Sequence, residues 1–132
     1  MPKPIWVALG GALGATLRYL VGGWVQRAAW VEGLRGGLAL LPWGTLVVNV
    51  SGCAAIGLLA GLLEERSIAS PELRLFLLVG VLGGYTTFSS FGLETHRLLA
   101  EGSLALALVN VVASVVAALG AVVAGAALAR VI

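Results

Sequence analysis

The chain has 132 residues, of which 60% are hydrophobic and 11% are charged, and its formal net charge is +2. This composition, with a mean hydropathy of +1.06, excludes an ordinary soluble domain and predicts a protein that lives in a lipid bilayer. The eight basic and six acidic residues lie mostly between apolar runs, so the exposed basic face of a nucleic-acid-binding protein is not expected.

The first predicted span covers about residues 5–24, roughly 20 residues and about 30 Å of helix, which matches one bilayer crossing. Trp6 and Trp24 bracket it as interfacial anchors. A cleaved signal peptide is the competing interpretation, because Lys3 precedes the apolar stretch. However, Arg18 interrupts that stretch, and the rest of the chain is itself apolar enough to enter the membrane. We therefore expect the segment to remain as a spanning helix.

Small residues at close-packing spacing and one charge stand out in this first span. Gly10 and Gly14 form a Gly-xxx-Gly pair, the spacing that lets a second helix approach closely. Arg18 is a charge inside a spanning segment, which is costly and usually faces protein or water. Two interpretations stay open for it: a functional residue, or an arginine that reaches from near the helix end to the headgroups.

The second predicted span covers about residues 40–63 and follows residues 26–37, which the sequence predicts to be a loop, either without regular structure or with a short surface helix. Thr45, Asn49 and Cys53 recur at i, i+4 and i+8, so they share one helical face. Asn49 either bonds to a neighbouring helix or presents an amide N–H to an anion. Cys53 is the only cysteine, which excludes an intrachain disulfide, and we interpret it as a small packing residue.

The third predicted span, about residues 72–93, departs from ordinary spanning helix at its middle. Ser70 suits the N-cap and Pro71 the first turn. The stretch Gly83–Phe91 reads GGYTTFSSF, with two glycines and four Thr or Ser residues at bilayer depth. Polar groups there are tolerated only where protein or a water-filled path surrounds them. We therefore expect a helix broken near its middle, with the break at Gly83–Thr86.

The fourth predicted span covers about residues 103–129, with Asn110 and Ser114 at i, i+4 on one face. A solvated turn is expected between the third and fourth spans, and its histidine is interpreted as an ordinary surface residue. The polar residues of this turn are Glu94, His96, Arg97 and Glu101. The chain is therefore predicted to be an all-α integral membrane protein with four transmembrane helices in a single domain, residues 1–132.

Loop charges nearly balance across the membrane. The side that holds both termini carries four basic residues and the opposite side three, which gives almost no preference under the positive-inside rule. We infer that the protein inserts in both orientations and pairs with an inverted copy of itself. The alternative is one fixed orientation, set by the single extra charge. The counted residues are Lys3, Arg66, Arg74 and Arg130 against Arg27, Arg35 and Arg97.

The residue inventory argues against an enzyme. The chain offers one His, one Cys and six Glu, and none of the carboxylates falls inside a predicted span. His96 has too few neighbouring ligands for a metal centre. The glycines of the third span lack the strand-to-helix context of a phosphate-binding loop.

The polar and aromatic residues inside the spans are the candidates for an ion path. They are rich in neutral donors and carry only a positive formal charge, which favours an anion, because amide and hydroxyl hydrogens can replace its hydration. Phe88 and Phe91 lie three residues apart and either present their positive ring edges to a small anion or simply pack. The other candidates are Arg18, Thr45, Asn49, Thr86, Thr87, Ser89, Ser90, Asn110 and Ser114.

Three motifs occur in order along the spans: GATLR at residues 14–18, GTLVVNVSG at residues 44–52 and GGYTTFSSF at residues 83–91. In this order they resemble the bacterial fluoride channels of the CrcB/Fluc family. The third motif is the most specific of the three, and the first alone is weak. The resemblance covers essentially the whole chain.

The resemblance implies a dual-topology homodimer with two antiparallel fluoride pores at the subunit interface. Phe88 and Phe91 match the aromatic residues that line the pores, and Asn49 matches the pore asparagine of the second helix. Asn110 and Ser114 match a polar track on the fourth helix. Members of the family often carry Tyr or His at the position of Asn110, and a further serine where this chain has Ala118.

The resemblance also implies a structural sodium ion at the two-fold axis. The break in the third helix would supply the backbone carbonyls of Gly83 and Thr86 from both subunits as ligands. Carbonyls released from helical hydrogen bonds are hard oxygen ligands, and a cation offsets the cost of burying them.

The function implied is passive export of cytoplasmic fluoride across the bacterial cell membrane. A small proton-coupled multidrug exporter is the alternative, since it too can be a four-helix, dual-topology dimer. Such an exporter needs an intramembrane carboxylate, and the predicted spans contain none. A third interpretation is a non-transporting membrane scaffold whose glycines serve only helix association.

Overall fold

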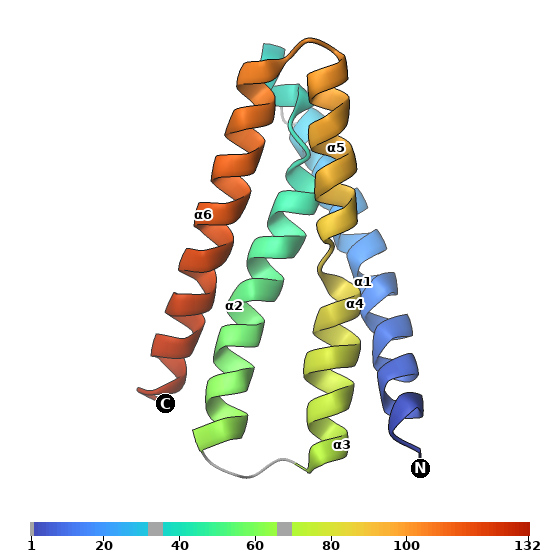
Figure 1. Cartoon of the computed structure of the whole chain (residues 1–132), viewed down its shortest axis with the longest axis vertical. Helices are drawn as coiled ribbons and strands as arrows, with labels where there is room; N and C mark the ends of the chain where they lie inside the picture. Colours follow the sequence, from blue (N-terminus) through green and yellow to red (C-terminus); the bar gives the residue numbers. More distant parts are fainter. Residues whose placement is uncertain (1, 32–35, 66–69) are drawn as a thin grey trace.

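The computed structural model describes residues 2–31, 36–65 and 70–132, which form helices joined by short turns (Figure 1). No strand occurs in these ranges, which confirms the all-α prediction. The elements are α1 (Lys3–Val31), the 3-10 helix η1 (Gly36–Leu40), α2 (Trp43–Glu65), α3 (Pro71–Arg74), the π-helical segment η2 (Leu75–Leu82), α4 (Gly83–Tyr85), α5 (Phe88–Ala100) and α6 (Leu104–Ala129).

Within the described ranges, four helical stretches are long and apolar enough to cross a membrane, which confirms the four predicted spans and a multi-pass membrane protein. Both ends of the chain lie at the same end of the bundle, as an even number of crossings requires (Figure 1). The stretches are Lys3–Trp30, Trp43–Leu63, Pro71–Ala100 and Leu104–Ala129.

The first helix extends beyond its predicted end at Trp24. α1 continues to Val31, so the prediction of a loop from residue 26 is wrong for this part. Tertiary contacts hold these last turns: Gln26 accepts a 3.1 Å hydrogen bond from the Gly44 N–H, and the Trp30 indole donates to the Ala39 carbonyl at 3.1 Å. The side chains of the last turns thereby fasten α1 to the segment that leads into α2. The charges Glu32, Arg35 and Arg66 lie outside the described residues.

The third span is interrupted near its middle, as predicted. Ser70 caps its start by accepting a 3.2 Å hydrogen bond from the Leu73 N–H, and Pro71 occupies the first turn. Helical backbone continues through α3, η2 and α4. Two extended residues, Thr86 and Thr87, then separate α4 from α5.

The break differs from the prediction in position, and α5 differs in length. Gly83 has helical angles, φ −64° and ψ −36°, so the break is Thr86–Thr87 and not Gly83–Thr86. α5 continues to Ala100, so the prediction of a turn is wrong for Glu94, His96 and Arg97, which are helical, and correct for Glu101.

The end of α5 is fixed by Gly102 rather than by the charged residues. Gly102 has φ +76°, which glycine adopts without strain. Its N–H donates to the Leu99 carbonyl at 3.0 Å, and the Ser103 N–H donates to the Leu98 carbonyl at 2.8 Å. This pair of hydrogen bonds is the Schellman pattern that ends a helix.

Glycines hold α1 against the first half of the third span. A Cβ at Gly14 would overlap the Val81 carbonyl, and one at Gly80 would come within 2.8 Å of the Gly10 Cα. A Cβ at Gly84 would lie 2.6 Å from the Gly11 carbonyl oxygen. The Gly-xxx-Gly pair in α1 therefore does permit close helix approach, with glycines on the facing segment as well.

The bundle buries little of its apolar surface within one chain. The buried cluster near one end consists of Leu41, Leu98 and Ala107. By contrast, Phe88 is 83% exposed and Tyr19 is 80% exposed, although both lie within spanning segments. A large part of the helix surface is thus available to lipid or to another chain.

Candidate functional site

Asn49 on α2 holds the break in the third span. Thr86 has φ −80° and ψ 155°, and Thr87 has φ −149° and ψ 119°, so neither continues the helix. The Thr87 N–H donates to Asn49 Oδ1 at 2.8 Å, and Asn49 Nδ2 donates to the Thr87 carbonyl at 3.0 Å. One side-chain amide thus satisfies both polar groups of the Thr87 backbone.

The carbonyls of Gly83 and Thr86 are among those that lose their usual helical donors at the break. In a continuous helix the Thr87 N–H would bond to the Gly83 carbonyl, and the Ser90 N–H to the Thr86 carbonyl. Here the Thr87 N–H bonds to Asn49, and the Ser90 N–H donates to Thr87 Oγ1 at 3.2 Å. The Gly83 and Thr86 carbonyls are therefore available as hard oxygen ligands, so the residues present fit the predicted sodium ion by their donor chemistry.

A small pocket of about 350 Å³, called here the phenylalanine pocket, lies on one side of the break. The rings of Phe88 and Phe91 contribute to its wall, with centroids 5.3 Å apart and planes inclined at 41°. Its polar walls come from Asn49 and Ser114, and Cys53 lines it as well. The full lining is Asn49, Cys53, Thr86, Thr87, Phe88, Phe91, Ser114, Val115, Ala118 and Leu119.

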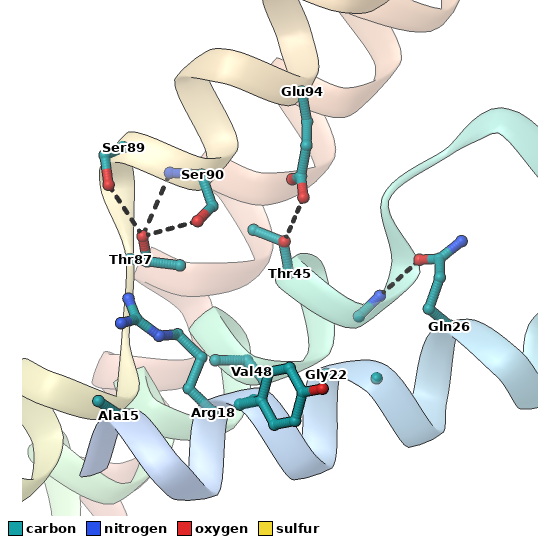
Figure 2. A pocket seen from close by; sticks show the side chains of 13 residues that line it. Ala15, Arg18, Gly22, Gln26, Thr45, Val48, Thr87, Ser89, Ser90 and Glu94 are labelled. Carbon is teal, nitrogen blue, oxygen red and sulfur yellow. Dashed lines mark hydrogen bonds between the residues drawn. The ribbon is translucent and has the colours of Figure 1, made fainter. Parts of the chain in front are cut away.

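A more polar pocket of about 500 Å³, called here the hydroxyl pocket, lies on the other side of the break (Figure 2). Thr87 Oγ1 donates to Ser90 Oγ at 3.1 Å and lies 3.2 Å from Ser89 Oγ. Figure 2 shows Arg18 reaching from α1 toward these hydroxyl groups. Across the pocket, Thr45 Oγ1 donates to Glu94 Oε1 at 2.8 Å.

The structure divides the predicted ion-path residues between these two pockets. Arg18, Thr45, Ser89 and Ser90 line the hydroxyl pocket, whereas Asn49, Phe88, Phe91 and Ser114 line the phenylalanine pocket. Thr87 lines both. Thr45, Asn49 and Cys53 share one face of the continuous helix α2, as predicted. Thr45 lines the hydroxyl pocket, and Asn49 and Cys53 line the phenylalanine pocket.

Asn110 lines neither of these two pockets. It is 3% exposed, and its Nδ2 donates to Thr95 Oγ1 at 2.9 Å. Thr95 in turn donates to the Phe91 carbonyl at 2.7 Å. Asn110 therefore connects α6 to the backbone that carries Phe91.

Glu94 and Thr95 are site residues that the sequence analysis missed. The sequence pattern places both in a turn, because a cluster of charged residues is typical of the end of a span. The statement that no carboxylate falls inside a span is wrong, since Glu94 lies within Pro71–Ala100. The available signal was the i, i+4 spacing of Ser90 and Glu94, which continues one face of α5.

Comparisons with known proteins all match this chain to the same family. A family model described as CrcB-like protein, Camphor Resistance (CrcB), matches residues 5–126. A protein of Agrobacterium fabrum named fluoride-specific ion channel FluC is 49% identical over 124 residues, 94% of this chain and 93% of that protein.

Two further proteins carry the same name. One from Rhizobium meliloti is 51% identical over 124 residues, 94% of this chain and 93% of its own length. One from Rhizobium johnstonii is 45% identical over 130 residues, 98% of each chain. The similarity thus spans all four helices.

Proposed function

The chain belongs to the CrcB-like protein family, and from this we propose that it is a fluoride-selective channel of the bacterial cell membrane, and not an enzyme. Cytoplasmic fluoride leaves passively, down its electrochemical gradient. The observation that carries the proposal is the pair of pockets that meet at Thr87, one rich in hydroxyl groups and one walled by two phenylalanines.

The hydroxyl pocket serves as the polar entrance to the path. Arg18 contributes a positive charge, and the hydroxyl groups of Thr87, Ser89 and Ser90 can rotate to donate toward an anion. Such donors replace part of the water that fluoride loses. The charge of Arg18 attracts anions and disfavours cations.

The phenylalanine pocket serves as the narrow part of the path. Asn49 Nδ2 has two hydrogens and gives one to Thr87, so the second remains for an anion. The Ser114 hydroxyl is a further donor on the facing helix. Phe88 and Phe91 present ring edges, which carry the positive part of the ring quadrupole. Weak donors of this kind let a small anion enter without trapping it.

The functional unit in this proposal is an antiparallel homodimer. Phe88 is 83% exposed in the single chain, so a second molecule is required to close this side of the path from lipid. An inverted copy agrees with the nearly balanced loop charges of the sequence. Two copies then give two antiparallel paths.

A sodium ion at the dimer axis is part of the same proposal. The carbonyls of Gly83 and Thr86 would hold it, together with their equivalents from the second copy. The ion supplies positive charge that offsets the burial of carbonyls without hydrogen-bond donors. Asn49 contributes by keeping the break extended, so that these carbonyls stay available.

A small proton-coupled exporter of organic cations remains the second candidate, because one observation favours it. Glu94 lies within the third span, where an exporter of this kind needs a carboxylate. Arg18 in the same pocket argues against a cationic substrate. Family membership and the two phenylalanines favour the channel.

A fluoride electrode distinguishes these functions. Purified protein is reconstituted in liposomes loaded with potassium fluoride, and efflux is started with valinomycin. This ionophore lets potassium leave with fluoride, so that no opposing membrane potential builds up. The channel predicts rapid fluoride release with little chloride release from matched liposomes. Proton-driven uptake of a cationic dye would support the exporter, and silence toward all three would support a non-transporting scaffold.

A further inference from the structure

Two nitrogen atoms at the end of the bundle that holds the chain termini are buried without a hydrogen-bond acceptor. They are the indole Nε1 of Trp6 in α1 and Nε of Arg74 in α3, and neither has a partner in the part of the chain that the structure describes. Neither residue lines the hydroxyl pocket or the phenylalanine pocket. Buried donors are normally paired, so these two indicate an acceptor that comes from outside the chain.

The two donors lie at the same depth in the membrane. α1 contacts α3, and the ring of Trp6 packs edge-on against Phe76, two residues beyond Arg74, with ring centroids 6.4 Å apart. Both helices start at the same end of the bundle (Figure 1). Their spanning stretches have 28 and 30 residues, which is longer than the roughly 20 residues that cross a hydrocarbon core. The first turns, with Trp6 and Arg74, therefore lie among the lipid headgroups.

The positive charge of Arg74 is open to the surface. Its two Nη nitrogens are not among the buried unpaired atoms, and its side chain forms no ion pair with another described side chain. Glu72 is two residues away, a spacing that places two side chains on different sides of a helix. Lys3 lies three residues before Trp6 and adds a second positive charge at this end. An anionic acceptor is therefore favoured over a neutral one.

The phosphate group of a phospholipid matches these donors. Its two non-ester oxygens share one negative charge, and a guanidinium binds such a group through a charge-assisted pair of hydrogen bonds. The indole N–H is a further donor for an oxygen of the same group. We propose that Arg74 and Trp6 form a binding site for the phosphate group of one phospholipid. The site is independent of the proposed fluoride path.

Binding follows an order that the burial of the donors dictates. The phosphate first contacts the open Nη nitrogens of Arg74. Because Arg74 Nε and Trp6 Nε1 are covered in the structure, rotation of the two side chains then brings these donors to the bound phosphate. The lipid thereby supplies the acceptor that both buried donors lack.

Native mass spectrometry of the detergent-purified protein tests the site, with short-chain phosphatidylglycerol as the probe. Arg74→Gln removes the charge, so the apparent dissociation constant of the tightest-bound lipid should rise by roughly tenfold. Trp6→Phe removes the N–H but keeps a ring against Phe76, so a rise of roughly threefold is expected. The matched controls Arg27→Gln and Trp24→Phe change exposed residues farther along α1 and should leave the constant unchanged. Wild-type affinity in Arg74→Gln would overturn the proposal.

A double variant tests whether one phosphate contacts both side chains. If it does, Trp6→Phe should raise the dissociation constant by less than about twofold once Arg74→Gln has removed the main contact. The same threefold rise with and without Arg74 would show two independent contacts and would overturn the shared site.

Two further ligands identify the source of the phosphate in the unmodified protein. Diacylglycerol with the same acyl chains lacks the phosphate and should bind roughly tenfold more weakly; equal binding would overturn the proposal. Inorganic phosphate lacks the acyl chains, so an equimolar amount should not displace the lipid. Displacement would assign the site to a free anion and overturn the lipid assignment.

Fluoride efflux from liposomes separates this site from the proposed channel. Arg74→Gln and Trp6→Phe should retain efflux, which also reports that each variant is folded, because neither residue lines a pocket of the fluoride path. Absent efflux in the unmodified protein would contradict the proposed channel and would leave the lipid site standing.

Discussion

Asn49→Asp provides the most direct test of the site, because it changes one atom of the amide that holds the break. The carboxylate can still accept from the Thr87 N–H, the 2.8 Å hydrogen bond of the wild-type chain. It cannot donate to the Thr87 carbonyl, which Asn49 Nδ2 approaches at 3.0 Å. Two acceptor oxygens then face each other where a hydrogen bond was.

The cost follows from the burial of Thr87, which is 8% exposed. An unsatisfied carbonyl at such a position costs about 1–3 kcal/mol of stability. The introduced charge adds to this cost because it is placed in a mainly apolar pocket, and it also repels fluoride. We therefore expect reduced stability of the dimer and loss of fluoride efflux together.

Two measurements check this expectation. Thermal unfolding of the purified protein in detergent reports the stability, and the fluoride electrode reports efflux from liposomes. Val47→Ala is the matched control, since this exposed residue lies on the same helix outside both pockets. Asn49→Asp protein that unfolds at the wild-type temperature and releases fluoride at the wild-type rate would refute the assignment of Asn49 to both the break and the path.

Three further substitutions test other parts of the structure. Phe88→Ile should abolish fluoride efflux but leave the dimer intact on size-exclusion chromatography, because an aliphatic side chain has no positive ring edge; full efflux would contradict the pore assignment. Gly14→Ala should destabilise the protein by about 1–3 kcal/mol, because the new Cβ overlaps the Val81 carbonyl. Gly11→Ala should leave the stability unchanged, because its Cβ meets nothing within 4 Å. Equal melting temperatures for the two variants would show that the close contact of Gly14 with the Val81 carbonyl is unimportant. Ser70→Ala should cost about 1 kcal/mol through loss of the N-cap and speed hydrogen exchange at the Leu73 amide; unchanged exchange would contradict the cap.

Sequence patterns predicted the number of spans because hydropathy is averaged over a whole segment, so that a single polar residue changes the average little. They also predicted the interrupted third span and the cap at Ser70, which depend on residues close together in the chain. The ends of α1 and α5 were predicted too early for a common reason. Charged residues are typical of the ends of spans, but a helix of 29 residues is about 44 Å long and reaches beyond the hydrocarbon core.

Sequence patterns do not predict that the site is divided into two pockets. Thr86 and Thr87 are extended, so α5 starts with a rotation that the spacing of residues does not encode. Ser89 and Ser90 thereby face a different pocket from Phe88 and Phe91. The role of Asn110 was hidden for a similar reason, since its partner Thr95 lies on another helix.

The break in the third span lies where the two pockets meet. Thr87 is the residue common to both pockets, so fluoride that moves between them within one chain passes its side chain or its backbone. Asn49 fixes that backbone, and Thr87 Oγ1 is itself tied to Ser89 and Ser90. An ion can therefore exchange hydroxyl partners along the start of α5 while the backbone stays in place. In the proposed path, the restraint on Thr87 would keep the two pockets joined while the ion passes.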